Sequence, residues 1–159
     1  MSKDPLREQL LELLGGAQAH APFAQVVANF PPELRGATPP GLPHSAWMLV
    51  EHMRIAQWDI LDFSRNPKYQ MPKWPEDYWP KTASPPSLSA WEQSLQGFAE
   101  DLQAMMQLVQ NPQTDLFAPI AWGDGQTILR EALLIADHNS HHLGQLIDLR
   151  RLLGVWNPK

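Results

Sequence analysis

Cysteine is absent from all 159 residues of the chain. Without it there are no disulfide bonds, no thiolate metal ligands and no cysteine nucleophile. A metal ion would have to be bound by histidine and carboxylate side chains, and the sequence offers 6 histidines and 17 acidic residues. The absence leaves the redox state of the protein's compartment open.

Long apolar runs and a basic excess are missing as well. No window approaches the roughly 18 consecutive apolar residues of a membrane-spanning helix. The start, Met1-Ser2-Lys3-Asp4, leads into an amphipathic segment and not into a signal peptide. The 12 Lys and Arg residues are scattered and outnumbered by 17 acidic ones, which gives a net charge of −5. We therefore expect a cytoplasmic protein that binds neither a membrane nor nucleic acid.

Length and composition fit one globular domain over residues 1–159, with 43% hydrophobic residues to fill its core. Apolar residues recur at spacings of three and four, which predicts an all-α four-helix bundle. The predicted helices span about 4–28, 44–64, 88–110 and a segment from the turn Gly123-Asp124-Gly125 to about Leu153. Gly15-Gly16 and Pro22 can interrupt the first helix. The residues on either side of the Gly-Asp-Gly turn can pair as a brief hairpin.

A long loop rich in proline and tryptophan separates the second and third predicted helices. Between residues 67 and 86 the prolines alternate with aromatic residues, namely Tyr69, Trp74, Tyr78 and Trp79. Aromatic side chains at this density usually pack on something, and a loop of about 20 residues in a compact domain is more often functional than idle. These side chains, together with Trp47 and Trp122, either wall a pocket or belong to the core.

Two histidines four residues apart distinguish the fourth predicted helix. His138 and His142 project from the same face about one turn apart, on the side that carries Leu146 and faces the core. On the second predicted helix, His52 lies on a comparable core-facing side. The helical period therefore offers His52 as a third partner for the pair. His141 falls on a charged edge, either as a surface residue or as a group that supports a ligand.

Buried histidines can also be purely structural. A single histidine on an apolar helix face is usually hydrogen-bonded to a neighbour in the core, and for His52 alone this is the more common situation. Two inward-facing histidines make a metal site more favourable relative to a structural role. Without a metal, up to four ring nitrogens would need hydrogen-bond partners in surroundings made mostly of leucine and isoleucine. From spacing alone, a metal site and a structural pair are equal alternatives. Asn139 stands where zinc peptidases carry glutamate, which disfavours peptidase chemistry.

Polar residues near the histidines are candidates for supporting roles. Gln145 lies on the same side of its helix as the pair, where it could orient a ligand or a water from outside the metal-binding set. Asp59 lies two turns beyond His52 and Glu131 two turns before His138, which makes both distant candidates for a general base or a supporting carboxylate. For each of them, a solvated or salt-bridged side chain is the more common state.

Two stretches carry a resemblance to a known family. They are residues 44–63, HSAWMLVEHMRIAQWDILDF, and residues 137–146, DHNSHHLGQL. Here the chain resembles the DinB superfamily of four-helix-bundle proteins, also described as DinB-like or YfiT-like metal-dependent hydrolases, and the resemblance covers nearly the whole chain. It implies a three-histidine metal site made of His52, His138 and His142, the same residues that the helical period selects.

The resemblance also implies a divalent metal, zinc or nickel, with an open coordination position for water or a small-molecule substrate. Such a site fits a metal-dependent hydrolase, and equally a transferase that uses a low-molecular-weight thiol, as relatives in the wider superfamily do. Fold analogy does not decide between the two. The alternative is a non-catalytic, stress-related helical binding module whose histidines are structural.

The fourth predicted helix is apolar on a second face as well. The residues on that face are Leu129, Leu133, Ala136, Leu143 and Ile147. A helix with two apolar faces must be covered on both. We expect a homodimer to cover this face, with packing of the aromatic loop as the competing explanation.

Overall fold

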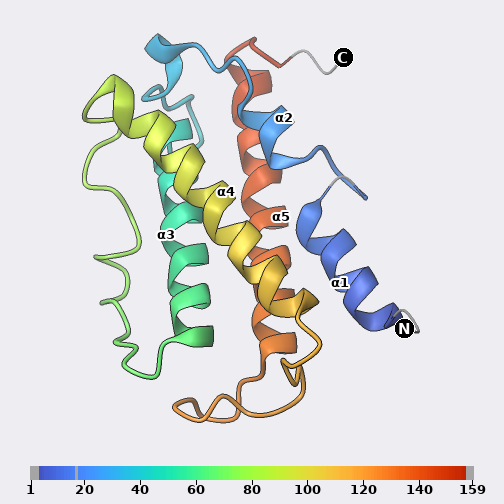
Figure 1. Cartoon of the computed structure of the whole chain (residues 1–159). Helices are drawn as coiled ribbons and strands as arrows, with labels where there is room; N and C mark the ends of the chain where they lie inside the picture. The colour runs from blue at the N-terminus through green and yellow to red at the C-terminus, as the bar shows by residue number, and fades with distance from the viewer. Residues whose placement is uncertain (1–3, 17, 157–159) are drawn as a thin grey trace.

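The computed structural model describes residues 4–16 and 18–156, which form a bundle of α-helices (Figure 1). The helices are α1 (Pro5–Gly15), α2 (Phe23–Val27), α3 (Ala46–Arg65), α4 (Leu88–Gln110) and α5 (Ile128–Leu152). A 3₁₀ turn, η1, covers Pro32–Leu34. The predicted all-α bundle is confirmed. In the described residues no helix is both long enough and apolar enough to cross a membrane.

The first predicted helix, residues 4–28, is divided in two. Asp4 caps α1 by accepting the backbone N–H of Leu6 at 3.1 Å, and Pro5 occupies the first helical position. Gly16 ends α1 with a φ of +71°, a conformation in which side chains other than glycine are strained. The chain becomes helical again only at α2, which follows Pro22. The interruption that Gly15-Gly16 and Pro22 made possible therefore occurs, and the predicted helix over residues 4–28 consists of two separate helices.

Side-chain caps set the start of each long helix. Ser45, Ser87 and Thr127 each accept the backbone N–H three residues ahead, at the first turns of α3, α4 and α5. Both ends of α3 and α4, and the end of α5, lie within two residues of the predicted positions. The predicted hairpin before α5 is reduced to one antiparallel bridge between Pro119 and Thr127.

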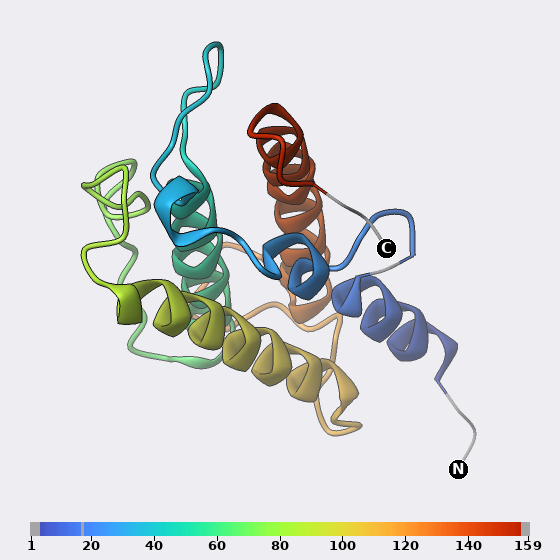
Figure 2. The same cartoon turned by 90° about the horizontal axis from the view of Figure 1, so that it is seen from above.

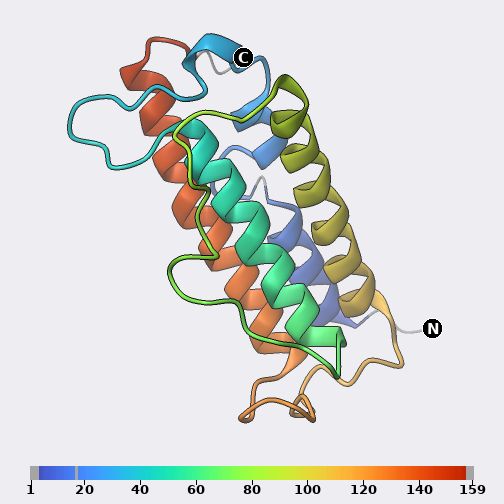
Figure 3. The ribbon, with the colours of Figure 1, turned by 90° about the vertical axis from the view of Figure 1, so that its left-hand side faces the viewer.

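Helix α3 lies at the centre of the packing, in contact with both α4 and α5. Helix α5 runs antiparallel to α3 beside it, while α4 crosses both at an angle (Figures 1 and 2). Helix α1 packs on α4 and α5, and α2 packs on α5. The loop between α3 and α4 returns along the outer side of α3 (Figure 3). This arrangement leaves the seam between α3 and α5 beside the loop.

The core consists of two apolar clusters, one beside α2 and one beside α1. A buried polar group lies between α3, α4 and α5. Asn139 donates through its Nδ2 to Oε1 of Gln57 at 2.9 Å, and Gln57 donates to the backbone carbonyl of Phe98 at 2.6 Å. The asparagine next to His138 therefore belongs to the core.

The second apolar face of α5 is mostly covered from within the chain. Leu143 is 3% exposed and packs in the cluster beside α2, together with Ile147, while Leu129 and Ala136 pack in the cluster beside α1. Leu133 remains 45% exposed. The two short N-terminal helices thus provide most of the cover for which we expected a second subunit or the aromatic loop.

Candidate metal centre

Three histidines from two antiparallel helices meet at the seam between α3 and α5. His52 comes from α3, and His138 and His142 come from consecutive turns of α5. One donor nitrogen of each ring lies within 4.8 Å of the other two, and the Nε2 atoms of His52 and His138 are 3.1 Å apart. His52 and His142 are buried, and His138 is half-buried. The structure thus brings together the three residues that the helical period selects.

Hydrogen bonds on the far side of two rings determine which nitrogen faces the centre. The Nδ1–H of His52 donates to the backbone carbonyl of Tyr78 at 2.8 Å. Because a carbonyl oxygen only accepts, this Nδ1 must carry the proton. The Nδ1–H of His142 donates to Oε1 of Gln145 at 2.7 Å. In both neutral rings the Nε2 lone pair is left for a metal ion, as is usual for histidine ligands.

Gln145 connects His142 to the exposed His141. While its Oε1 accepts from His142, its Nε2–H donates to Nε2 of His141 at 3.2 Å. The amide therefore holds the His142 ring from behind, which is the supporting position that its place on the helix suggested. His141 lies outside the three-nitrogen group and is connected to it through Gln145 and through an edge contact with the ring of His142.

Burial keeps these imidazoles neutral. Loss of hydration lowers the pKa of His52 to about 4; the hydrogen bond to Tyr78 opposes this shift, and the nearby His142 and His44 add to it. Burial, together with the neighbouring histidines, lowers the pKa of His138 to about 3. The pKa of His142 is lowered too, mainly by burial. At neutral pH all three rings are uncharged, the state in which histidine binds a metal.

The donor set fits a divalent transition metal. Imidazole nitrogens suit zinc and nickel. With Zn–N bonds of about 2.0–2.1 Å, a tetrahedral angle separates two ligand nitrogens by about 3.3 Å, close to the 3.1 Å between the Nε2 atoms of His52 and His138. A set of three protein ligands is typical of catalytic zinc sites, in which water or substrate takes the remaining position.

The loop between α3 and α4 covers one side of the centre. The indole of Trp79 stacks on His52 with centroids 3.8 Å apart and an angle of 2° between the planes. On its other face Trp79 stacks on His44, at 4.1 Å. Trp74 of the same loop is 67% exposed and Trp47 is buried in the core. Of the aromatic side chains considered as pocket walls, Trp79 is thus the one that touches a metal-binding histidine.

Asp59 holds this loop in place. Its two carboxylate oxygens accept the hydroxyl protons of Tyr69 at 2.8 Å and Tyr78 at 2.6 Å. Burial and the bonds to this carboxylate raise the pKa of both tyrosines, so that they remain donors. Asp59 is therefore linked to His52 through Tyr78, whose hydroxyl binds the carboxylate and whose carbonyl binds the imidazole.

Glu131, the other carboxylate considered as a general base, is occupied by an ion pair. Its Oε1 lies 2.7 Å from Nη1 of Arg130, and its side chain is 2% exposed. Burial raises the pKa of Glu131, and the bond to Arg130 opposes that shift. Both carboxylates considered as general bases are thus bonded to other side chains, Asp59 to two tyrosines and Glu131 to Arg130.

Sequence reasoning did not assign His44, Tyr78 and Trp79 to the centre. His44 precedes the N-cap of α3, where the helical period does not apply, and the two aromatic residues lie in a loop without a period. The density of aromatic residues in that loop was the available signal. It indicated that the loop packs on the domain without showing which side chain faces the histidines.

Fold and site together define an all-α helical bundle with a three-histidine group suited to a metal. Comparison with known families agrees: the model of the DinB superfamily matches residues 16–146. The chain belongs to the DinB superfamily. No curated protein matches the chain. The solved structures contain no match either.

Proposed function

We propose that the protein is a metal-dependent enzyme that binds zinc or nickel through His52, His138 and His142 and acts on a small molecule. The observation that carries this proposal is the convergence of three neutral imidazoles, two of which have their Nδ1 protons bonded elsewhere. Structural histidines would need partners for these inward nitrogens. Here they face one another, with only one N–N distance, 3.1 Å, short enough for a hydrogen bond among them.

A divalent ion at this centre would supply a Lewis acid able to polarise a carbonyl or to lower the pKa of a bound water or thiol. The residues of the chain prepare the centre for that ion. Tyr78 and Gln145 hold the rings of His52 and His142 with Nε2 inward. Trp79 covers one face of His52 and excludes water from it.

Two reactions suit such a centre, hydrolysis and S-transfer from a low-molecular-weight thiol. The state of the carboxylates favours S-transfer. Hydrolysis of an amide needs a group that returns a proton to the leaving nitrogen, and the two candidate carboxylates, Asp59 and Glu131, are engaged by tyrosines and by an arginine. When a thiol ionises at a metal its proton passes to bulk water, and the sulfur then attacks an electrophilic carbon and displaces a leaving group that departs as an anion, so no protein acid is required.

The test uses protein depleted of metal and reloaded with Co²⁺, whose thiolate complexes absorb strongly in the near ultraviolet. Titration with L-cysteine should produce a saturable thiolate-to-metal band in the wild type and none in His138→Ala. Metal-dependent cleavage of p-nitrophenyl acetate without such a band would identify a hydrolase instead. Metal binding without either signal would leave the non-catalytic binding module as the function.

We also propose that the protein forms a homodimer. The proposal now rests on a smaller surface than the whole second apolar face of α5. Leu13 of α1 and Leu133 of α5 are 46% and 45% exposed. Both line one hollow of about 410 Å³ between the two helices. An apolar hollow of this kind is suited to a second copy of the chain.

A further inference from the structure

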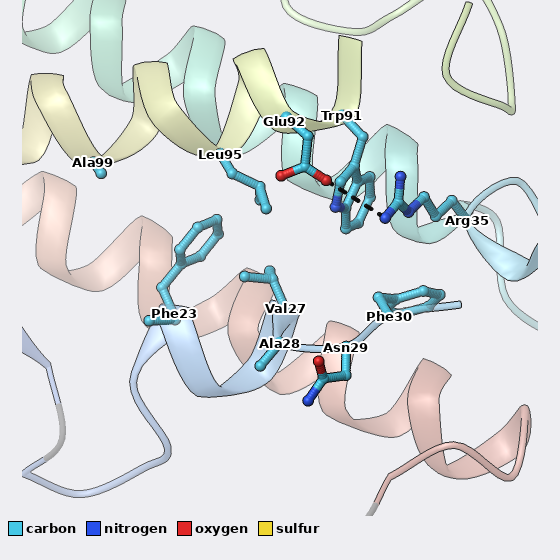
Figure 4. A pocket seen from close by; sticks show the side chains of 11 residues that line it. Phe23, Val27, Ala28, Asn29, Phe30, Arg35, Trp91, Glu92, Leu95 and Ala99 are labelled. Carbon is cyan, nitrogen blue, oxygen red and sulfur yellow. Dashed lines mark ion pairs between the residues drawn. The ribbon is translucent and has the colours of Figure 1, made fainter. Parts of the chain in front are cut away.

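A second hollow of about 490 Å³ lies between α2 and the first half of α4 (Figure 4). Its α2 side is formed by Phe23 and Val27, and its α4 side by Trp91 and Leu95, while Arg35 closes one end. The residues that line it do not include the three histidines between α3 and α5. Its volume is within the range of small-molecule sites, about 300–1,000 Å³.

The apolar walls of this hollow are held rigidly by the core. Trp91 is 1% exposed and Val27 is 7% exposed, and both belong to the apolar cluster beside α2. The ring of Phe23 stacks on Phe98 with centroids 3.9 Å apart. Walls fixed in this way persist without a ligand, so an apolar group that enters the hollow does not first have to order them.

Arg35 supplies the one cation of this pocket, and its hydrogen bonding is incomplete. The guanidinium lies over the ring of Trp91, with Cζ 4.6 Å from the centroid, and its side chain is 12% exposed. Among the residues that the structure describes, Nε of Arg35 is buried without a hydrogen-bond partner. The carboxylate of Glu92 is 3.6 Å from Nη2, beyond hydrogen-bond length, and is itself 68% exposed. A buried donor without an acceptor is costly, so this end of the hollow is suited to an acceptor from outside the chain.

We propose that this pocket binds a small organic acid, with its carboxylate on Arg35 and its apolar body against Phe23, Val27 and Leu95. The planar guanidinium carries its N–H donors in a fork that matches the two oxygens of a carboxylate, and the exposed Glu92, 3.6 Å from Nη2, is the partner that such an acid would displace. A monoanion fits better than a phosphate ester, because Glu92 beside the guanidinium would repel a second negative charge. The proposal is independent of the metal centre and of the enzyme function proposed for it.

The test compares octanoate with octanamide, which has the same apolar body without the charge. In the full-length protein, ¹H–¹⁵N spectra should show saturable shifts at the Trp91 indole and the Arg35 Nε–H on addition of octanoate. Octanamide should bind at least about tenfold more weakly than octanoate, which is the loss expected when a charge-assisted bidentate contact is removed. Equal shifts with both compounds, or shifts that do not saturate, would overturn the proposal.

Three variants locate the site. Arg35→Gln should reduce octanoate binding about tenfold, while Arg151→Gln, which changes an exposed arginine paired with Asp148, should leave it unchanged. Glu92→Gln should strengthen octanoate binding a few-fold, because it removes the competing negative charge. If Arg35→Gln fails to fold, the Glu92→Gln variant tests the proposal in its place, and an unchanged affinity for octanoate would then refute it. His138→Ala should bind octanoate as the wild type does, which separates this site from the metal centre.

Discussion

Replacing Tyr78 with phenylalanine should weaken metal binding even though Tyr78 is not a ligand. The substitution removes the hydroxyl that donates to Asp59 at 2.6 Å. It leaves the backbone carbonyl that accepts from His52, but that carbonyl lies in a loop which has lost one of its two anchors on Asp59. A hydrogen bond to a charged group contributes about 1.5–3 kcal/mol. Loss of a group that orients a ligand typically costs about 10–100-fold in metal affinity.

We expect the lower end of that range, about tenfold, because Tyr69 still holds Asp59. Tyr69→Phe is the matched control. It removes the same hydroxyl from the same carboxylate, at 2.8 Å, while the residue bonded to His52 keeps its own anchor. It should reduce the thermal unfolding temperature about as much as Tyr78→Phe while leaving metal affinity within about twofold of the wild type.

The assay is titration of each metal-depleted variant with Zn²⁺ against a competing chelator, with thermal unfolding measured in parallel. Nitrogen-15 shifts of the His52 ring add a readout that does not depend on metal, since they report whether Nδ1 or Nε2 carries the proton. Wild-type zinc affinity in Tyr78→Phe would refute the reasoning. So would equal losses of affinity in the two tyrosine variants.

The remaining predictions concern pH, the buried polar group and the subunit interface. The pKa values of His52 and His138 are lowered to about 4 and about 3, so between these values and the ordinary pKa near 6.5 the unfolded chain binds more protons than the folded chain. The metal-free protein should therefore have its full stability above pH 6.5 and lose stability as the pH drops towards 4. Chemical unfolding at several pH values measures this loss. Asn139→Ala leaves Oε1 of Gln57 without its donor and should cost about 1–3 kcal/mol in the free energy of unfolding, which chemical unfolding would measure. Light scattering should give the mass of a dimer for the wild type and of a monomer for Leu133→Asp, and a wild-type monomer would contradict the proposed homodimer.

Regular helices made the central part of the site predictable. The spacing of His138 and His142 and the position of His52 among apolar residues follow from the helical period. Side-chain direction along a rigid helix is fixed once the buried side is known, so three residues from distant parts of the sequence could be placed on one seam.

The contacts that support the histidines could not be predicted, because they come from irregular backbone. Trp79 and Tyr78 lie in a proline-rich loop in which no period relates one side chain to the next. Asp59 was placed near the site by its position on α3, yet its partners are two loop tyrosines, and only the folded loop reveals them. The helix pattern also did not predict that α2 packs on the second apolar face of α5. This packing depends on the irregular backbone after Gly16, which separates α2 from α1 and lets it pack on α5 by itself.

The central claim is that His52, His138 and His142 bind a metal ion. It is tested most directly by elemental analysis of untagged protein, purified as the wild type, His138→Ala and His141→Ala. The account predicts close to one zinc or nickel per chain in the wild type and in His141→Ala, whose ring lies outside the three-nitrogen group, and almost none in His138→Ala. A wild type that holds no metal, even after addition of zinc or nickel, would contradict the account and leave a bundle with structural histidines.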